Sequence, residues 1–322
     1  MADRTNPQNK AAYGGPGWSP RTLAAATEIG TLWSSCGIDS EFARLKSVLM
    51  HRPGNELLAS HTDFNKVKML HVLDVDRAQA QHDALVQAYR DHGVTVFDLG
   101  HPGNATPNQM FMADVFVMTP EGAIVARPAS TIRAGEERWA SQAIGRLGMP
   151  ITKTIGGHGT FEGADLIWIT PKLALVARGL RTNDEGFHQV EATLHAMGVR
   201  ALQIQLPYGS MHLMGMLRIL DNNLALCWQT RISHVAVDVL RDNGYEILWV
   251  PDEVEARDGF AFNMVTLGPR KVMTPSGNPI SRKYYEDHGV ECVMVDVSEL
   301  GKASGAIGCL TGIIERELMA NL

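Results

Sequence analysis

The chain has 322 residues, a formal net charge of −6 and a hydrophobic fraction of 45%, which is ordinary for a soluble protein with a large core. No Lys/Arg run appears, and no apolar run reaches the roughly 18 residues of a membrane-spanning helix, so nucleic-acid and membrane partners are not expected. The first 20 residues are polar and rich in Gly and Pro, unlike a signal peptide. We expect a cytoplasmic protein.

The four cysteines have neither CxxC spacing nor a His-rich partner run; they are Cys36, Cys227, Cys292 and Cys309. This excludes zinc-finger and thioredoxin motifs and favours a reducing compartment.

The first 40 residues contain few periodic apolar positions, so we predict a partly irregular N-terminal arm over 1–40 and a single catalytic domain over 41–322. A short strand is expected at Ser47–His51, and Pro53 and Gly54 end it.

After this strand, an amphipathic helix that ends at a glycine and continues into a β-branched strand recurs five times. The first copy is a helix over Arg77–His92, then Gly93, then the strand Val94–Phe97. The glycine positions lie 45 to 55 residues apart, at Gly93, Gly148, Gly198, Gly244 and Gly289. Glycine just after a helix end is a left-handed cap, and a regular interval of this length is typical of a repeat architecture.

Paired short strands fall between these corners: Val115–Thr119 with Ala123–Ala126, Leu166–Ile169 with Leu173–Ala177, Leu217–Leu220 with Leu224–Cys227, and Met264–Leu267 with Val272–Thr274. Each unit is then strand–strand–helix–strand, too small to bury its own apolar face. We predict an α/β ring of five ββαβ blades, in which a strand after Cys309 completes the blade begun at Ser47. The alternative is a mixed α/β sheet whose helix–Gly–strand corners recur because such corners are common.

Three of these strand pairs are preceded by acids or a histidine: Asp114, then Glu162 and Asp165, then His212. If the blades form a ring, these positions converge at its centre. Each residue also has a structural interpretation, since an Asp before a strand often makes a local turn bond and a lone His among apolar neighbours is often a core residue. Recurrence at one topological position favours a shared site.

Cys309 follows a glycine-spaced loop, Gly301–Gly308, that can press close to a ligand. Cys227 and Cys292 fit the alternative of a small buried hydrophobe better. A Cys with a His supplies a nucleophile and a proton carrier, and neighbouring acids indicate a cationic substrate. A guanidinium group fits, because carboxylates bind its flat, delocalised charge in a bidentate manner.

These residues, with Phe161–Asp165 and Arg181–Asn183, resemble those of the guanidine-modifying enzymes of the pentein fold: amidinotransferases, arginine deiminases and dimethylarginine dimethylaminohydrolases. The match covers roughly residues 41–320 in the right order, and that family is a five-bladed ββαβ ring. The resemblance implies that Cys309 is the nucleophile, that His212 is the general acid/base oriented by Glu162, and that Asp114 grips the guanidinium, with Asp165 as a further substrate-binding acid. Arg133 and Arg181 match positions that bind an α-carboxylate in the dimethylarginine hydrolases, although each also fits a surface charge at a helix start.

The chain departs from several relatives at three positions. Met214 replaces the Asp of the His-x-Asp pattern of deiminases and amidinotransferases, Ala113 replaces an Arg or Glu, and Gly308 replaces a His. Losing the Asp weakens the case for plain arginine and for the transferase, and leaves an apolar patch suited to a substituted nitrogen. The dimethylarginine hydrolases also lack this Asp.

We therefore predict a cysteine-dependent hydrolase of a guanidino compound that passes through a covalent S-alkylthiouronium intermediate and needs neither metal nor organic cofactor. An amidinotransferase, in which an acceptor amine intercepts that intermediate, and a non-catalytic guanidine-binding protein are the alternatives. The sequence leaves the guanidine's side chain and a homo-oligomer open.

Overall fold

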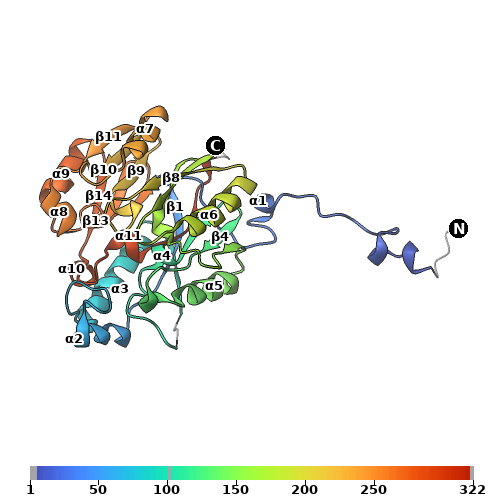
Figure 1. Ribbon diagram of the computed structural model, residues 1–322, viewed down its shortest axis with the longest axis horizontal. Coiled ribbons are helices and arrows are strands. Elements are labelled where there is room, and N and C mark those ends of the chain that lie inside the picture. The colour runs from blue at the N-terminus through green and yellow to red at the C-terminus, as the bar shows by residue number, and fades with distance from the viewer. Residues whose placement is uncertain (1–5, 101–102, 320–322) are drawn as a thin grey trace.

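Five three-stranded sheets make up the body of the protein in a computed structural model that describes residues 6–100 and 103–319 (Figure 1). In each sheet the middle strand pairs antiparallel with one neighbour and parallel with the other. The strands are β1 (Leu45–Met50), β2 (Thr95–Asp98), β3 (Phe116–Thr119), β4 (Gly122–Val125), β5 (Ile151–Thr154), β6 (Leu166–Thr170), β7 (Leu173–Arg178), β8 (Arg200–Gln205), β9 (Leu217–Asp221), β10 (Leu224–Cys227), β11 (Glu246–Trp249), β12 (Val265–Gly268), β13 (Lys271–Pro275), β14 (Glu291–Val295) and β15 (Gly312–Arg316).

The first sheet joins the two ends of the body. Its order is β15–β1–β2, and β15 pairs antiparallel with β1 in the place that the first strand occupies in the other four sheets. The prediction that a strand after Cys309 completes the blade begun at Ser47 is confirmed, and so is the ring of five strand–strand–helix–strand units.

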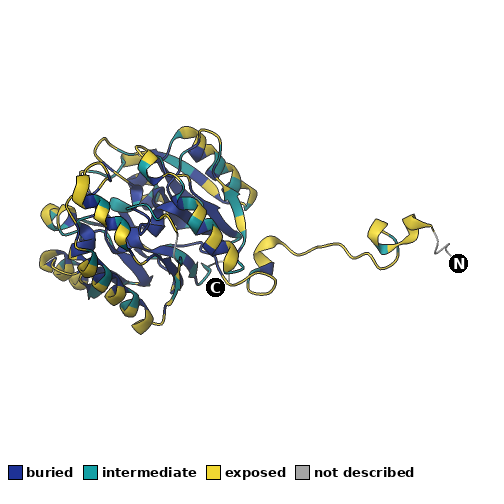
Figure 2. Ribbon diagram, turned by 90° about the horizontal axis from the view of Figure 1, so that it is seen from below, coloured by how far each residue is buried: buried dark blue, intermediate teal, exposed yellow. Residues whose placement is uncertain are grey.

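The longer helices lie on the outside, with exposed outer faces around buried strands (Figure 2). They are α3 (Val75–Asp91), α5 (Glu136–Arg146), α6 (Asp184–Ala196), α7 (His234–Asp242) and α9 (Pro279–Asp287), with shorter helices α1 (Ala25–Glu28), α2 (Ala59–Asp63), α8 (Glu253–Arg257) and α10 (Ser298–Gly301). The five predicted capping glycines follow the five longer helices, and all have φ between 72° and 79°, which is the left-handed conformation.

The N-terminal segment runs from the body as an extended arm, with short 3-10 turns at Pro7–Asn9 and Ala11–Tyr13 (Figure 1). Closer to the body, Cys36 and Ile38 are buried and Gly37 bridges to Glu315 in β15. The division into an arm over 1–40 and a domain over 41–322 stays a prediction. Within the described ranges, every helix is too short or too polar to cross a membrane.

Candidate active site

A short turn leads into the first strand of each sheet, and Asp114, Glu162, His212 and Cys309 lie on these turns or directly before them. The turns are α4 (Met112–Val115) before β3, the 3-10 turns η5 (Gly163–Asp165) before β6 and η6 (Leu213–Gly215) before β9, the turn at 261–262 before β12, and α11 (Ile307–Leu310) before β15. Contacts link α11 to α4, α4 to η5 and η5 to η6. The repeat therefore gathers Asp114, Glu162, His212 and Cys309 from four blades.

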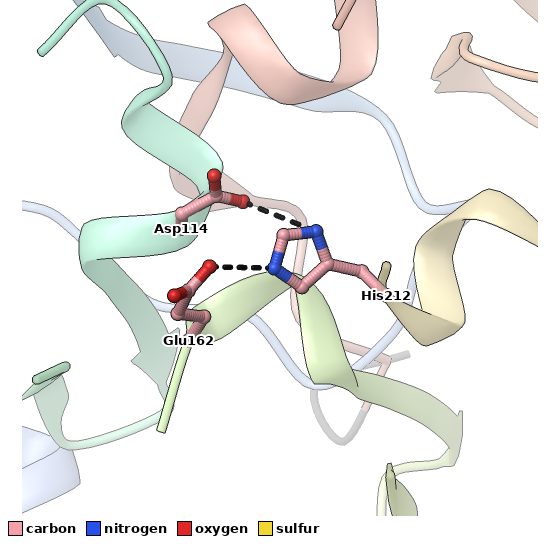
Figure 3. Close-up of side chains that lie close together, drawn as sticks. All are labelled: Asp114, Glu162 and His212. Atoms are coloured by element: carbon pink, nitrogen blue, oxygen red, sulfur yellow. Dashed lines mark hydrogen bonds and ion pairs between the residues drawn. The ribbon is translucent and has the colours of Figure 1, made fainter. Parts of the chain in front are cut away.

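Asp114 and Glu162 hold the His212 imidazole between them (Figure 3). Nε2 of His212 lies 2.7 Å from Oε2 of Glu162, and Nδ1 lies 3.7 Å from Oδ1 of Asp114. All three side chains are at most 3% exposed. Two acids on opposite ring nitrogens favour the imidazolium form.

Two arginines share these carboxylates. Arg133 places Nη1 2.6 Å from Oδ2 of Asp114 and 3.5 Å from Oε2 of Glu162, and its Nη2 lies 2.8 Å from Oε2 of Glu136. Arg181 places Nη1 3.2 Å from Oε1 of Glu162. Buried charges are tolerated when they are paired in this way, and Oδ1 of Asp114 keeps no hydrogen-bond partner among the described residues.

The cluster shifts the pKa values of its members in opposite directions. Burial alone would lower the pKa of His212, but the charge of Asp114 and the hydrogen bond and charge of Glu162 raise it to about 9. Burial alone would raise the pKa of Glu162, but His212, Arg133 and Arg181 hold it well below its usual range. At neutral pH the pair is an imidazolium and a carboxylate, so His212 is able to donate a proton.

This charge state predicts a pH dependence of stability. His212 has a higher pKa in the folded protein than the ordinary value of 6.5, so its contribution is complete below about pH 6.5 and is lost as the pH rises through about 9. In urea unfolding, we expect the stability difference between the wild type and His212→Gln to shrink over this window. The exposed His195→Gln is the matched control, and a difference that is constant from pH 6 to 9.5 would contradict the assignment.

The Cys309 thiol is 8% exposed and is held by Asn263. Nδ2 of Asn263 donates to Sγ of Cys309 over 3.0 Å, and Oδ1 of Asn263 accepts from the Cys309 backbone N–H over 3.1 Å. Burial raises the pKa of the Cys309 thiol, as does the charge of Asp114, while the Asn263 donor and the charge of Arg218 act in the opposite direction.

Arg218 lies against the glycine that precedes Cys309. Its guanidinium is buried, and Nη2 has no hydrogen-bond partner among the described residues. A β-carbon at Gly308 would collide with that Nη2 and lie 2.9 Å from Oδ1 of Asn263. A larger residue at 308 would therefore have to displace the buried cation near the sulfur or the side chain that holds the sulfur.

Asp165 does not line either cavity that Cys309 borders. Its Oδ2 accepts from Oγ1 of Thr182 over 2.6 Å and its Oδ1 accepts from the Leu213 backbone N–H over 3.0 Å, so both oxygens are engaged. Burial raises its pKa to about 6. In place of the predicted contact with substrate, this geometry supports a positioning role, because Leu213 follows His212 directly.

Two cavities meet at Cys309. A small one, which we call the acid cavity, has about 10 Å³ of space between Cys309, Asp114, Arg133 and Arg181, with Lys68, Asn108, Phe111, Met211 and Ser304 completing its wall. The second cavity has about 290 Å³ and includes His212, Met214 and Asn263 in its wall. Met214, at the position where some relatives carry Asp, thus lines the same open space as Cys309.

The acid–histidine cluster also has the composition of a metal site, since one ligand atom each from Asp114, Glu162 and His212 lies within 4.8 Å of the others. The guanidinium groups of Arg133 and Arg181 already pair with these carboxylates. The three side chains therefore fit a cation-binding site, and the cations that they bind in this structure are the guanidinium groups of Arg133 and Arg181.

Sequence reasoning missed Asn263, Arg218 and Glu136. A signal for Asn263 was present, because it stands two residues before the first strand of its pair, as Asp114 does before β3. Arg218 lies inside the apolar strand β9, and its direction toward Gly308 follows only from the packing of two blades.

Comparisons with known proteins identify the family of this chain. A family model described as N,N dimethylarginine dimethylhydrolase, eukaryotic, matches residues 59–315. N(G),N(G)-dimethylarginine dimethylaminohydrolase of Streptomyces coelicolor is 28% identical over 269 residues, 83% of this chain and 96% of the relative. The chain belongs to this dimethylarginine hydrolase family, within the guanidino-modifying enzymes of the pentein superfamily.

Solved structures show the same fold. DDAH from Pseudomonas aeruginosa, a mutant complexed with citrulline, superposes with a TM-score of 0.71 at 24% identity, over 84% of this chain and 99% of that one. SxtG, an amidinotransferase from Microseira wollei, superposes with a TM-score of 0.70 at 15% identity, over 88% of this chain and 97% of that one. At these identities the structures report the architecture alone.

Proposed function

We propose that this protein hydrolyses a guanidino compound through Cys309, giving a ureido product and an amine or ammonia. The observation that carries the proposal is the acid cavity, where the Cys309 sulfur and the Asp114 carboxylate line one enclosed space while His212 and its partner Glu162 adjoin it. Membership of the dimethylarginine hydrolase family supports a reaction at a guanidino C–N bond.

In the proposed reaction, Asp114 binds N–H groups of the guanidinium with its free oxygen, which orients the central carbon toward sulfur. The substrate cation offsets the burial and the Asp114 charge that raise the thiol pKa, so its arrival favours the thiolate. The thiolate adds to the carbon, and His212 donates its proton to the departing amine. Water, deprotonated by His212, then adds to the resulting thiouronium and releases the ureido product and the thiol.

Arg133 and Arg181 remain proposed substrate ligands on the strength of the family resemblance. Both line the acid cavity, but both already face carboxylates of the protein. A substrate carboxylate would have to compete with Asp114, Glu136 and Glu162 for them.

A panel of guanidino compounds, assayed for ureido product and released amine, tests the activity. We expect ureido product from at least one compound, with and without added glycine or ornithine. A new guanidino product that appears only with the added amine would indicate an amidinotransferase instead. A 2-chloroacetamidine that labels Cys309 no faster than Cys292 would remove the nucleophile from the proposal.

A further inference from the structure

The second cavity lies beside the nucleophile and is not explained by the catalytic residues alone. It shares Met211, Ser304 and Cys309 with the acid cavity, so the two spaces meet at the sulfur. The acid cavity admits only about one water molecule by volume. The second cavity, with about 290 Å³, is close to the size of a small ligand site. A guanidino compound that reaches the Cys309 sulfur therefore has room for most of its atoms in the second cavity and not in the acid cavity.

The wall of this cavity combines apolar and basic side chains. Met214, Trp228, Phe260 and Phe262 supply the apolar surface, and Arg231 and Arg257 supply cationic side chains. Among its described lining residues there is no Asp or Glu, and His212 adds a third positive charge. This is the charge pattern of a site for an anion at the end of an apolar chain.

Arg231 is the cation best placed to bind that anion. Its guanidinium carbon lies 4.2 Å from the centroid of the Trp228 ring, and the guanidinium forms no hydrogen bond or salt bridge among the described residues. Hydrogen bonds from Thr230 and Trp228 lower the pKa of Glu253, and the charge of Arg231 adds to this effect. The ring is itself fixed, because Nε1 of Trp228 donates to Oε1 of Glu253 over 3.3 Å. Arg257, by contrast, pairs with Asp258 at 2.7 Å.

The two arginines of the acid cavity are less available. Arg133 is 3% exposed and pairs with Asp114, Glu136 and Glu162, and Arg181 pairs with Glu162. Moving either toward a substrate would strip a buried carboxylate of its partner, which is costly.

Resting on the proposed function, we propose that the substrate is a guanidino acid whose tail lies in the second cavity with its anionic end on Arg231. Hydrolysis adds one water and releases one amine or ammonia, and the tail carboxylate is unchanged.

The test is protection of Cys309 from 2-chloroacetamidine, read by mass spectrometry of the labelled peptide. The protecting compounds are 3-guanidinopropionate and 4-guanidinobutyrate, each with its neutral amide, and agmatine. In the wild type we expect each carboxylate to protect at a concentration about tenfold or more below its amide, as for a charge-assisted hydrogen bond. Arg231→Met should remove this preference and leave protection by the amides unchanged.

Arg241→Met is the matched control and should keep the preference, because Arg241 is an exposed arginine in the last turn of α7, the helix that follows Arg231 in the chain. Equal protection by carboxylates and amides in the wild type would overturn the proposal, as would loss of the preference in Arg181→Met but not in Arg231→Met. Failure of the proposed function is a separate outcome. It would appear as the absence of ureido product, and the protection of Cys309 from labelling can be measured whether or not product forms.

Discussion

Replacing Cys309 by serine is expected to reduce kcat by about ten-thousand-fold or more, because the alkoxide needed for attack is far less accessible than a thiolate. Serine is smaller than cysteine and keeps a polar atom for Nδ2 of Asn263, so the fold should be unchanged. Ureido product formed per enzyme under saturating substrate is the measurement, with the urea unfolding midpoint as the check on folding.

Cys292→Ser is the matched control. Cys292 lies in β14, half-buried, in a different blade, and does not line the cavities at Cys309. The Cys292→Ser variant should retain a kcat near that of the wild type. Retained turnover in Cys309→Ser would remove the covalent intermediate from the mechanism.

The second large effect is expected from Asp114→Asn, which should raise KM and lower kcat together. The carboxylate has three tasks: Oδ2 pairs with Arg133, Oδ1 lies 3.7 Å from the His212 ring, and the side chain lines the acid cavity. The asparagine side chain lacks the negative charge with which Asp114 would bind a guanidinium. It also removes the largest cause that raises the pKa of His212, so the alkaline limb of the kcat profile should move to lower pH.

Initial rates between pH 6 and 10 with the best guanidino substrate check this prediction. Asp238→Asn, an exposed acid on α7 with a side chain that is 52% exposed, is the control for the change in charge. An unchanged kcat/KM in Asp114→Asn would take Asp114 out of the site.

The architecture was predictable because its signal is local and repeated. Each longer helix stops at a glycine that adopts a left-handed conformation, as at Gly93 and Gly244, and a short strand follows at nearly every corner. Most of the strands in the structure begin or end one or two residues from the limits expected from the sequence. Val115, for example, was expected in a strand and instead closes the turn α4, which gives Asp114 its direction toward the centre.

The sequence predicted which loops converge at the site, but not the direction in which each side chain points. Asp114 and Asp165 occupy similar positions before a strand, yet one lines a cavity and the other bonds Thr182 and Leu213. Which way such a side chain turns depends on the neighbouring blade. Arg133 pairs with Glu136 three residues further along and with Asp114 of the same blade. Its contact with Glu162 and the approach of Arg218 to Gly308 join different blades, so no single stretch of sequence reveals those two contacts.

The pairing of β15 with β1 has a consequence for biosynthesis. Cys309 lies on α11, directly before the last strand, while the partner of that strand is the first strand of the body. A growing polypeptide can form four of the five sheets before the thiol has left the ribosome. The site around Cys309 is therefore completed only after β15 has been synthesised and has paired with β1, and a truncated product that ends before residue 309 has neither the sulfur nor the strand that closes the ring.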